Sequence, residues 1–88
     1  MRRWLEISND GESEIYDVHW AWLAEDPEAE IIMPQPLSDP FPLPVLQHGV
    51  TVPILISVFL ETTPDLRVQT SWKDSSDQRH SQVWPVTL

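Results

Sequence analysis

The chain has 88 residues, a length that closes one hydrophobic core and therefore predicts a single domain over residues 1–88. Hydrophobic residues make up 41% of it and five residues are tryptophan, which excludes the composition of a natively disordered chain despite a net charge of -9. The absence of cysteine excludes a disulfide framework and thiolate metal sites, so the fold has to be stabilised by packing.

The charge is unevenly distributed along the chain. After Arg2 and Arg3 the next basic residue is Arg67, and every acidic residue except Asp74 and Asp77 lies between them. An acidic surface of this kind repels phosphate backbones. The sequence therefore predicts no direct nucleic-acid binding and favours a basic protein partner, or solubility alone, as the reason for the acids.

Targeting signals are not visible in the sequence. No apolar stretch follows the first two arginines, so no secretory signal is recognised. The most apolar segment, residues 50–60, is too short to cross a bilayer as a helix, and no membrane insertion by the chain is expected. The lack of a signal peptide and of cysteine favours the cytoplasm.

Apolar residues recur with period two along most of the chain, and nine prolines against two glycines argue against helices, so an all-β fold is predicted. The first strand is expected over residues 3–8, with Leu5 and Ile7 inward and Trp4 outward. A turn at residues 9–11 follows, because Asn, Asp and Gly accept positive φ most readily.

A second strand is expected over residues 14–23, where the stretch YDVHWAW places three rings on one parity. The even positions are predicted to face the core: Tyr16, Val18, Trp20 and Trp22. Asp17 and His19 then face solvent. The same parity argument assigns Trp72 and Trp84 to the core, where each buried ring contributes roughly 1.5 to 3 kcal/mol.

The middle of the chain combines a weak strand signal with a proline-rich segment. Residues 30–33 are expected to form a short strand. Five prolines between Pro34 and Pro44 predict extended, loop-like backbone with little ladder pairing, apart from a brief pairing at Val45 and Leu46.

Residues 50–60 carry the strongest strand signal, with Val52, Ile54, Ile56, Val58 and Leu60 on one face. The other face carries Leu55 and Phe59, which the proline-rich segment is expected to cover by folding across them. An open patch that forms a weak homodimer is the alternative.

Two more strands, over residues 66–72 and 79–88, flank a polar connection. Short alternating strands with frequent turn signals predict an antiparallel two-sheet sandwich of about seven strands, with a proline-rich middle segment.

Several elements occur in an order typical of a known family: Asn-x-Gly at 9–11, Asp-Val at 17–18, Leu-Pro-Val-Leu-x-x-Gly at 43–49, Val-x-x-x-Trp-x-Asp at 68–74, and Val-Thr-Leu at 86–88. Over nearly the whole chain this resembles the bacterial immunoglobulin-like sandwiches of the CARDB type, which occur in many bacterial proteins, actinobacterial ones among them. The resemblance implies an immunoglobulin-like fold and a role in adhesion, spacing or protein interaction. The immunoglobulin cysteine pair is missing, and the proline-rich segment replaces strands that such domains often place there.

No catalytic, cofactor or metal site is predicted. His19, His48 and His80 lack the spacing of metal ligands and are expected on the surface. Asp74 and Asp77 bracket two serines in a way that could suit calcium, but a solvated hairpin turn explains them better. The sequence has neither a Gly-x-Ser-x-Gly elbow nor an oxyanion loop, so no enzyme is expected.

The expected function is therefore that of a non-catalytic interaction or spacer module of a bacterial protein. Its partner surface is expected among residues left outside the core: Trp4, Glu12, Glu14, Asp17, His19, Leu55 and Phe59. Two alternatives stay open. An acidic phage-type inhibitor that mimics nucleic acid requires the acids of residues 10–30 to form one continuous face, and a carbohydrate-binding module requires at least two coplanar exposed tryptophans.

Overall fold

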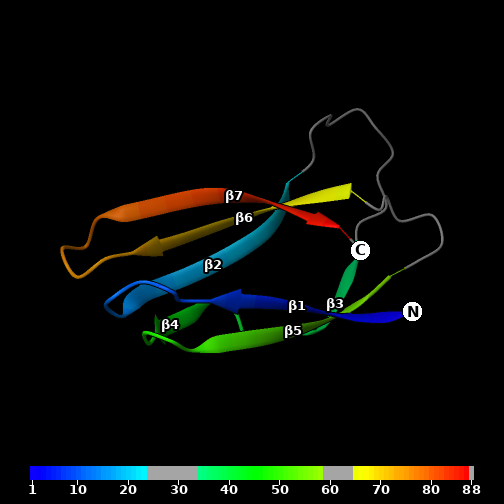
Figure 1. Ribbon diagram of the computed structural model, residues 1–88, viewed down its shortest axis with the longest axis horizontal. Coiled ribbons are helices and arrows are strands. Elements are labelled where there is room, and N and C mark those ends of the chain that lie inside the picture. The colour runs from blue at the N-terminus through cyan, green and yellow to red at the C-terminus, as the bar shows by residue number, and fades with distance from the viewer. Residues whose placement is uncertain (24–33, 59–64, 88) are drawn as a thin grey trace.

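The computed structural model describes residues 1–23, 34–58 and 65–87, and this part of the chain is all-β (Figure 1). It contains seven strands: β1 (Arg2–Ser8), β2 (Ile15–Leu23), β3 (Gln35–Ser38), β4 (Leu43–Leu46), β5 (Thr51–Ser57), β6 (Asp65–Lys73) and β7 (Arg79–Thr87). They form a three-stranded sheet in the order β1-β5-β3 and a four-stranded sheet in the order β4-β2-β6-β7. All pairings are antiparallel, which confirms the predicted two-sheet architecture. The described residues include no helix long and apolar enough to cross a membrane.

The core is made of alternating aliphatic residues from both sheets. The buried hydrophobic residues are Val18, Leu46, Ile54, Ile56, Leu66 and Val68. Ile54 and Ile56 are 0% exposed, so the predicted inward face of β5 is confirmed. Trp4, at 63% exposed, lies outside as expected, because it pairs across the strands with Leu55 while its neighbour Leu5 pairs with Ile54.

A β-bulge at Asp17 reverses the alternation of β2. The pairing with β6 jumps from Tyr16 opposite Lys73 to His19 opposite Ser71, and Asp17 has a φ of 49°. Tyr16 therefore lies with Lys73 on the outer face of the sheet. The prediction that Tyr16 faces the core is wrong, because one inserted residue moves every side chain before it to the opposite face.

The proline-rich segment contributes a strand to each sheet. β4 pairs with β2, so the predicted pairing at Val45 and Leu46 is confirmed. The loop predicted for the rest of the segment is wrong in part, because residues 35–38 also form a strand, which lies beside β5 and not across its outer face at Leu55. Both strands lie at the edge of their sheet, where a proline can direct its missing N–H away from the partner strand. The strand expected over residues 30–33, and Phe59 with Leu60, lie outside the described residues.

The hydrogen-bond register of β1 explains how the central strand of the smaller sheet accommodates a proline. Met1 and Val58 exchange backbone hydrogen bonds of 2.7 and 3.2 Å, so the odd-numbered residues of β1 bond to β5. Glu6 and Pro53 are consequently a non-hydrogen-bonded pair. On its other side β5 pairs with β3 only as far as Leu55, so Pro53 lacks no ladder bond.

Asn9 links the two sheets at one end of the sandwich. The residue is only 5% exposed, and its Nδ2 donates to the carbonyl oxygens of Leu46 at 3.0 Å and Ser13 at 2.9 Å. Its Oδ1 accepts from the backbone N–H of Gly11 at 3.0 Å, and its carbonyl accepts from that of Gly49 at 2.8 Å. The end of β1 is thereby fixed to the end of β4 and to both adjoining turns.

Asn9→Asp is expected to lower the free energy of unfolding by about 2–4 kcal/mol at neutral pH, because a carboxylate cannot donate to the two carbonyls and leaves them unsatisfied. Urea unfolding measures the change. Asp10→Asn is the matched control: this neighbour is exposed, and a change within about 0.5 kcal/mol is expected. Equal losses in the two variants would contradict the cross-sheet role of Asn9.

Candidate functional site

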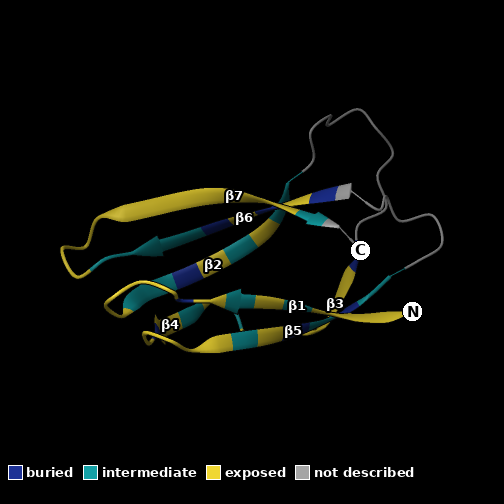
Figure 2. Ribbon diagram, viewed as in Figure 1, coloured by how far each residue is buried: buried dark blue, intermediate teal, exposed yellow. Residues whose placement is uncertain are grey.

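One side of the sandwich is open. β7 is the outer strand of the four-stranded sheet, and the three-stranded sheet ends at β1, with no strand opposite β7 among the described residues (Figure 1). Most of β7 is accordingly exposed, whereas β6 beside it contributes buried residues (Figure 2). Trp84 shares the inner face with Val68, its cross-strand partner, and yet is 46% exposed. The prediction that Trp84 is buried is wrong, because no strand of the described part of the chain faces it.

A groove of about 560 Å³ lies between β1 and the β6–β7 hairpin, and we call it the open groove. Its apolar lining comes from five strands: Leu5, Ile7, Ile15, Val18, Leu46, Val68, Trp72, Trp84 and Val86. Asp10, Glu12 and Asp74 stand at the end of the groove that is formed by the turns. None of the described residues that line the groove is a lysine, arginine or histidine, so the groove is apolar with an acidic end.

Polar contacts fix the two rings of the open groove. Trp84 Nε1 donates to Thr70 Oγ1 at 3.0 Å, which holds the indole against β6. The ring of Trp72 stacks on that of His80 with a centroid distance of 5.9 Å and an interplanar angle of 22°. His80 Nε2 in turn lies 2.7 Å from Asp74 Oδ2. Both indoles are thus held in place although neither is enclosed.

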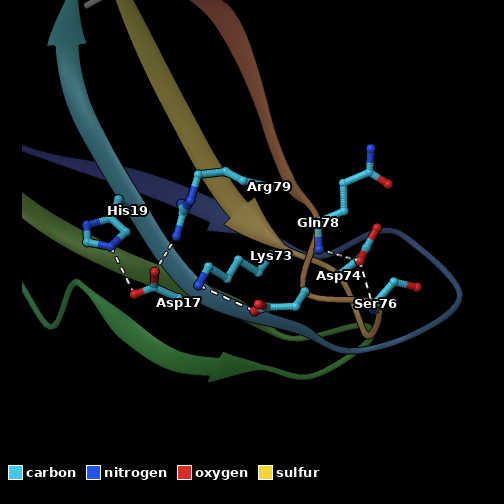
Figure 3. Close-up of polar contacts among 8 residues, drawn as sticks. Asp17, His19, Lys73, Asp74, Ser76, Gln78 and Arg79 are labelled. Atoms are coloured by element: carbon cyan, nitrogen blue, oxygen red, sulfur yellow. Dashed lines mark hydrogen bonds and ion pairs between the residues drawn. The ribbon is translucent and has the colours of Figure 1, made fainter.

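Asp74 organises the turn between β6 and β7. Its Oδ1 accepts from the backbone N–H groups of Ser76 at 2.8 Å and Gln78 at 3.1 Å (Figure 3). The hydrogen bond with His80, followed by these backbone bonds, holds the pKa of Asp74 below its usual value. The turn is the predicted hairpin, with Asp77 at a φ of 62° in its last position. Among the described residues no group of three potential ligands is placed to hold a metal ion.

Asp17 forms a second polar cluster on the outer face of the four-stranded sheet. Its Oδ1 lies 3.0 Å from His19 Nε2, and its Oδ2 accepts from Arg79 Nη2 (Figure 3). Arg79 Nη1 also donates to Ser71 Oγ at 3.0 Å, so the cluster spans β2, β6 and β7. The hydrogen bond with His19 is the main cause that lowers the pKa of Asp17, and the charge of Arg79 acts in the same direction.

The Asp17 cluster has the geometry of a solvated strap between strands. The side chains of Asp17 and His19 are each 48% exposed, and that of Arg79 is 39% exposed. Ser71 contacts Arg79, and no hydrogen bond joins it to His19 in this part of the chain. The arrangement therefore lacks the base-to-nucleophile contact that acyl transfer requires.

The residues predicted as one partner surface lie on different faces. Trp4 and Leu55 are cross-strand partners on the outer face of the three-stranded sheet. Asp17 and His19 lie on the outer face of the other sheet. The remaining members are not with either pair: Glu12 and Glu14 are exposed between β1 and β2, and Phe59 is outside the described residues.

The open groove was not predicted, because it depends on which strands of the two sheets lie opposite each other. The sequence signal for it is the apolar run Val83 to Val86 on β7, which places Trp84 and Val86 on one face of the strand.

The described residues give little support to the two alternative functions, a carbohydrate-binding module and an acidic mimic of nucleic acid. The exposed tryptophans, Trp4 and Trp84, lie on the outer face of one sheet and the inner face of the other, so they form no coplanar pair. Asp10 and Glu12 stand at the groove while Asp17 is on the outer face, so these acids form no single continuous face. The acids of residues 25–30 lie outside the described part.

No family model, curated protein or solved structure matches the chain. The comparisons therefore do not bear on the resemblance to CARDB-type domains. The geometry of the open groove and of the Asp17 cluster remains as the guide to function.

Acidification is expected to destabilise the fold through Asp17 and Asp74. Because their pKa values are lowered in the folded state, both carboxylates stabilise it above the usual carboxyl pKa, and this stability is lost as the pH falls through the lowered values. The free energy of unfolding should therefore decrease below about pH 4. Asp17→Asn and Asp74→Asn should each flatten this decrease in urea unfolding series, and an unchanged pH dependence in both would contradict the assignment.

Proposed function

We propose that the chain is a non-catalytic interaction module of immunoglobulin-like type that binds a protein partner through the open groove. The exposure of Trp84 carries this proposal. A large ring on the inner face of a sheet is left 46% exposed, in a domain whose stability depends on burying apolar surface. Burial of such surface contributes about 25 cal/mol per Å², so a partner that covers the inner face of β7 gains directly from it.

The composition of the groove favours a protein as the ligand. An apolar floor with a charged end is typical of a protein interface, where an aromatic anchor is surrounded by polar groups. The acids at its end, Asp10, Glu12 and Asp74, favour a partner with basic residues. A module that serves only as a spacer would have no reason to leave Trp84 uncovered.

The polar groups support a role without catalysis. Asp74 is occupied by the backbone of its own turn and by His80. Asp17, His19 and Arg79 form a solvated strap outside the groove. Neither set combines a nucleophile, a base and an enclosed pocket, which are the features that identify a catalytic site.

Selection from a random peptide library displayed on phage tests the proposal, with Gln82→Arg as the blocking variant and Ser81→Arg as its control. Gln82 lines the groove, Ser81 is the preceding residue of β7, and both are exposed, so either arginine is compatible with folding. Ligands selected on the wild-type chain should lose at least about tenfold in affinity, or 1.4 kcal/mol, on Gln82→Arg and little on Ser81→Arg.

Isothermal titration calorimetry measures these affinities. Equal binding to the wild-type chain and to Gln82→Arg, or failure to select any ligand, would contradict a role for the open groove.

A further inference from the structure

We propose, on the basis of the function proposed above, that the occupant of the open groove is an extended, basic segment of a partner protein that adds to β1 as a fourth strand of the smaller sheet. The four-stranded sheet is one strand wider than the three-stranded sheet, and the surplus strand is β7. A strand added beside β1 restores equal widths and lies opposite β7. It would therefore cover the inner face that is now exposed.

The backbone of β1 presents hydrogen-bonding groups along the edge at which this pairing would occur. Since its odd-numbered residues bond to β5, the N–H and C=O groups of Trp4, Glu6 and Ser8 point to the other edge of the strand. Within the described part of the chain no strand pairs with that edge. A row of unpaired backbone groups on an edge strand is the template used in strand addition.

The edge of β7 is a poorer template. Asp74 donates its backbone N–H to the carbonyl of Gln78, so the even-numbered residues of β7 bond to β6 and the odd-numbered ones face outward. One of these is Pro85, which has no N–H to donate and interrupts the row. β1 contains no proline, so the incoming segment is assigned to β1.

The side chains of the groove define the chemistry of the segment. Residues of the incoming strand that point inward meet Ile7, Trp84 and Val86, so every second residue should be apolar. Residues that point outward lie across from Glu6, whose cross-strand neighbour is best a lysine or arginine. The end of the segment reaches Asp10 and Glu12, which again favour a basic residue.

Charge also favours a segment of another protein over a second copy of this chain as the occupant of the open groove. The chain carries a net charge of -9, and the described lining of the groove has acids but no basic residue. Two copies therefore repel each other through their net charge, whereas a basic partner is attracted to the acidic end of the groove. A segment as long as β1, seven residues, suffices to occupy the edge.

The test uses a synthetic peptide of the length of β1 that alternates lysine with valine, and amide hydrogen exchange of the whole chain. Exchange at Trp4, Glu6 and Ser8 should slow at least tenfold when the peptide is bound, while Ser81 and Val83 on the edge of β7 should change little. A peptide of the same composition with its valines adjacent, and one with glutamate in place of lysine, should bind at least tenfold more weakly.

Glu6→Pro is the blocking variant, because it removes an N–H that faces the free edge and breaks no bond to β5. It should weaken peptide binding at least tenfold, whereas Glu6→Gln, which keeps the N–H and removes the same charge, should weaken it less than Glu6→Pro. Exchange on the wild-type chain decides the matter even where Glu6→Pro does not fold.

The outcomes separate this proposal from the one on which it rests. Slowed exchange at Ser81 and Val83 in place of β1, or slowing that grows with protein concentration without peptide, would overturn strand addition by a partner. Library ligands that depend on Gln82 but leave exchange at β1 unchanged would also overturn it, while the groove would still be a binding site. If no ligand is sensitive to Gln82→Arg, both strand addition at β1 and binding at the open groove are overturned.

Discussion

The hydrogen bonds of the Asn9 side chain are the constraint on which the arrangement of the two sheets depends. The aliphatic side chains of the core set a distance between the sheets but no direction. One further polar link is the hydrogen bond of 3.0 Å from Trp22 Nε1 on β2 to the carbonyl of Pro34, which precedes β3. The amide of Asn9 joins the end of β1 to the carbonyl of Leu46 at the end of β4, and it does so in a buried setting where a lost partner is costly. This contact fixes the end of β1 relative to the four-stranded sheet at the turn end of the open groove.

The bulge at Asp17 stabilises the other wall of the open groove, strand β7. Packing on the inner face stabilises an uncovered strand only a little, so β7 depends on other contacts to remain in the sheet. Asp17 supplies one, because its carboxylate reaches Arg79 at the start of β7 across the intervening strand. Asp17, which interrupts the alternation of β2, thus also stabilises the position of β7, the strand that carries Trp84.

The sequence predicted the strands well and their surroundings poorly. Period-two alternation located β1, β2, β5, β6 and β7 and the buried faces of Ile54 and Val68, because these depend on local pattern. Tyr16 was misplaced, since a bulge leaves no mark in a hydrophobicity pattern. Trp84 was misplaced because parity gives the side of a strand but not what faces it. The open groove joins residues from β1 to β7, and their approach is fixed only by strand order.

Three prolines of the chain lie on edge strands, where they limit aggregation. Of the four strands at sheet edges, β3, β4 and β7 carry Pro36, Pro44 and Pro85, and β1 carries none. Proline on an edge is a common protection against the stacking of sheets from different molecules. In the described structure β1 is protected by its own charged side chains, Arg2, Arg3 and Glu6, and by the net charge of the chain, and salt screens both. Colloidal stability in this domain is therefore governed by one seven-residue strand and by ionic strength.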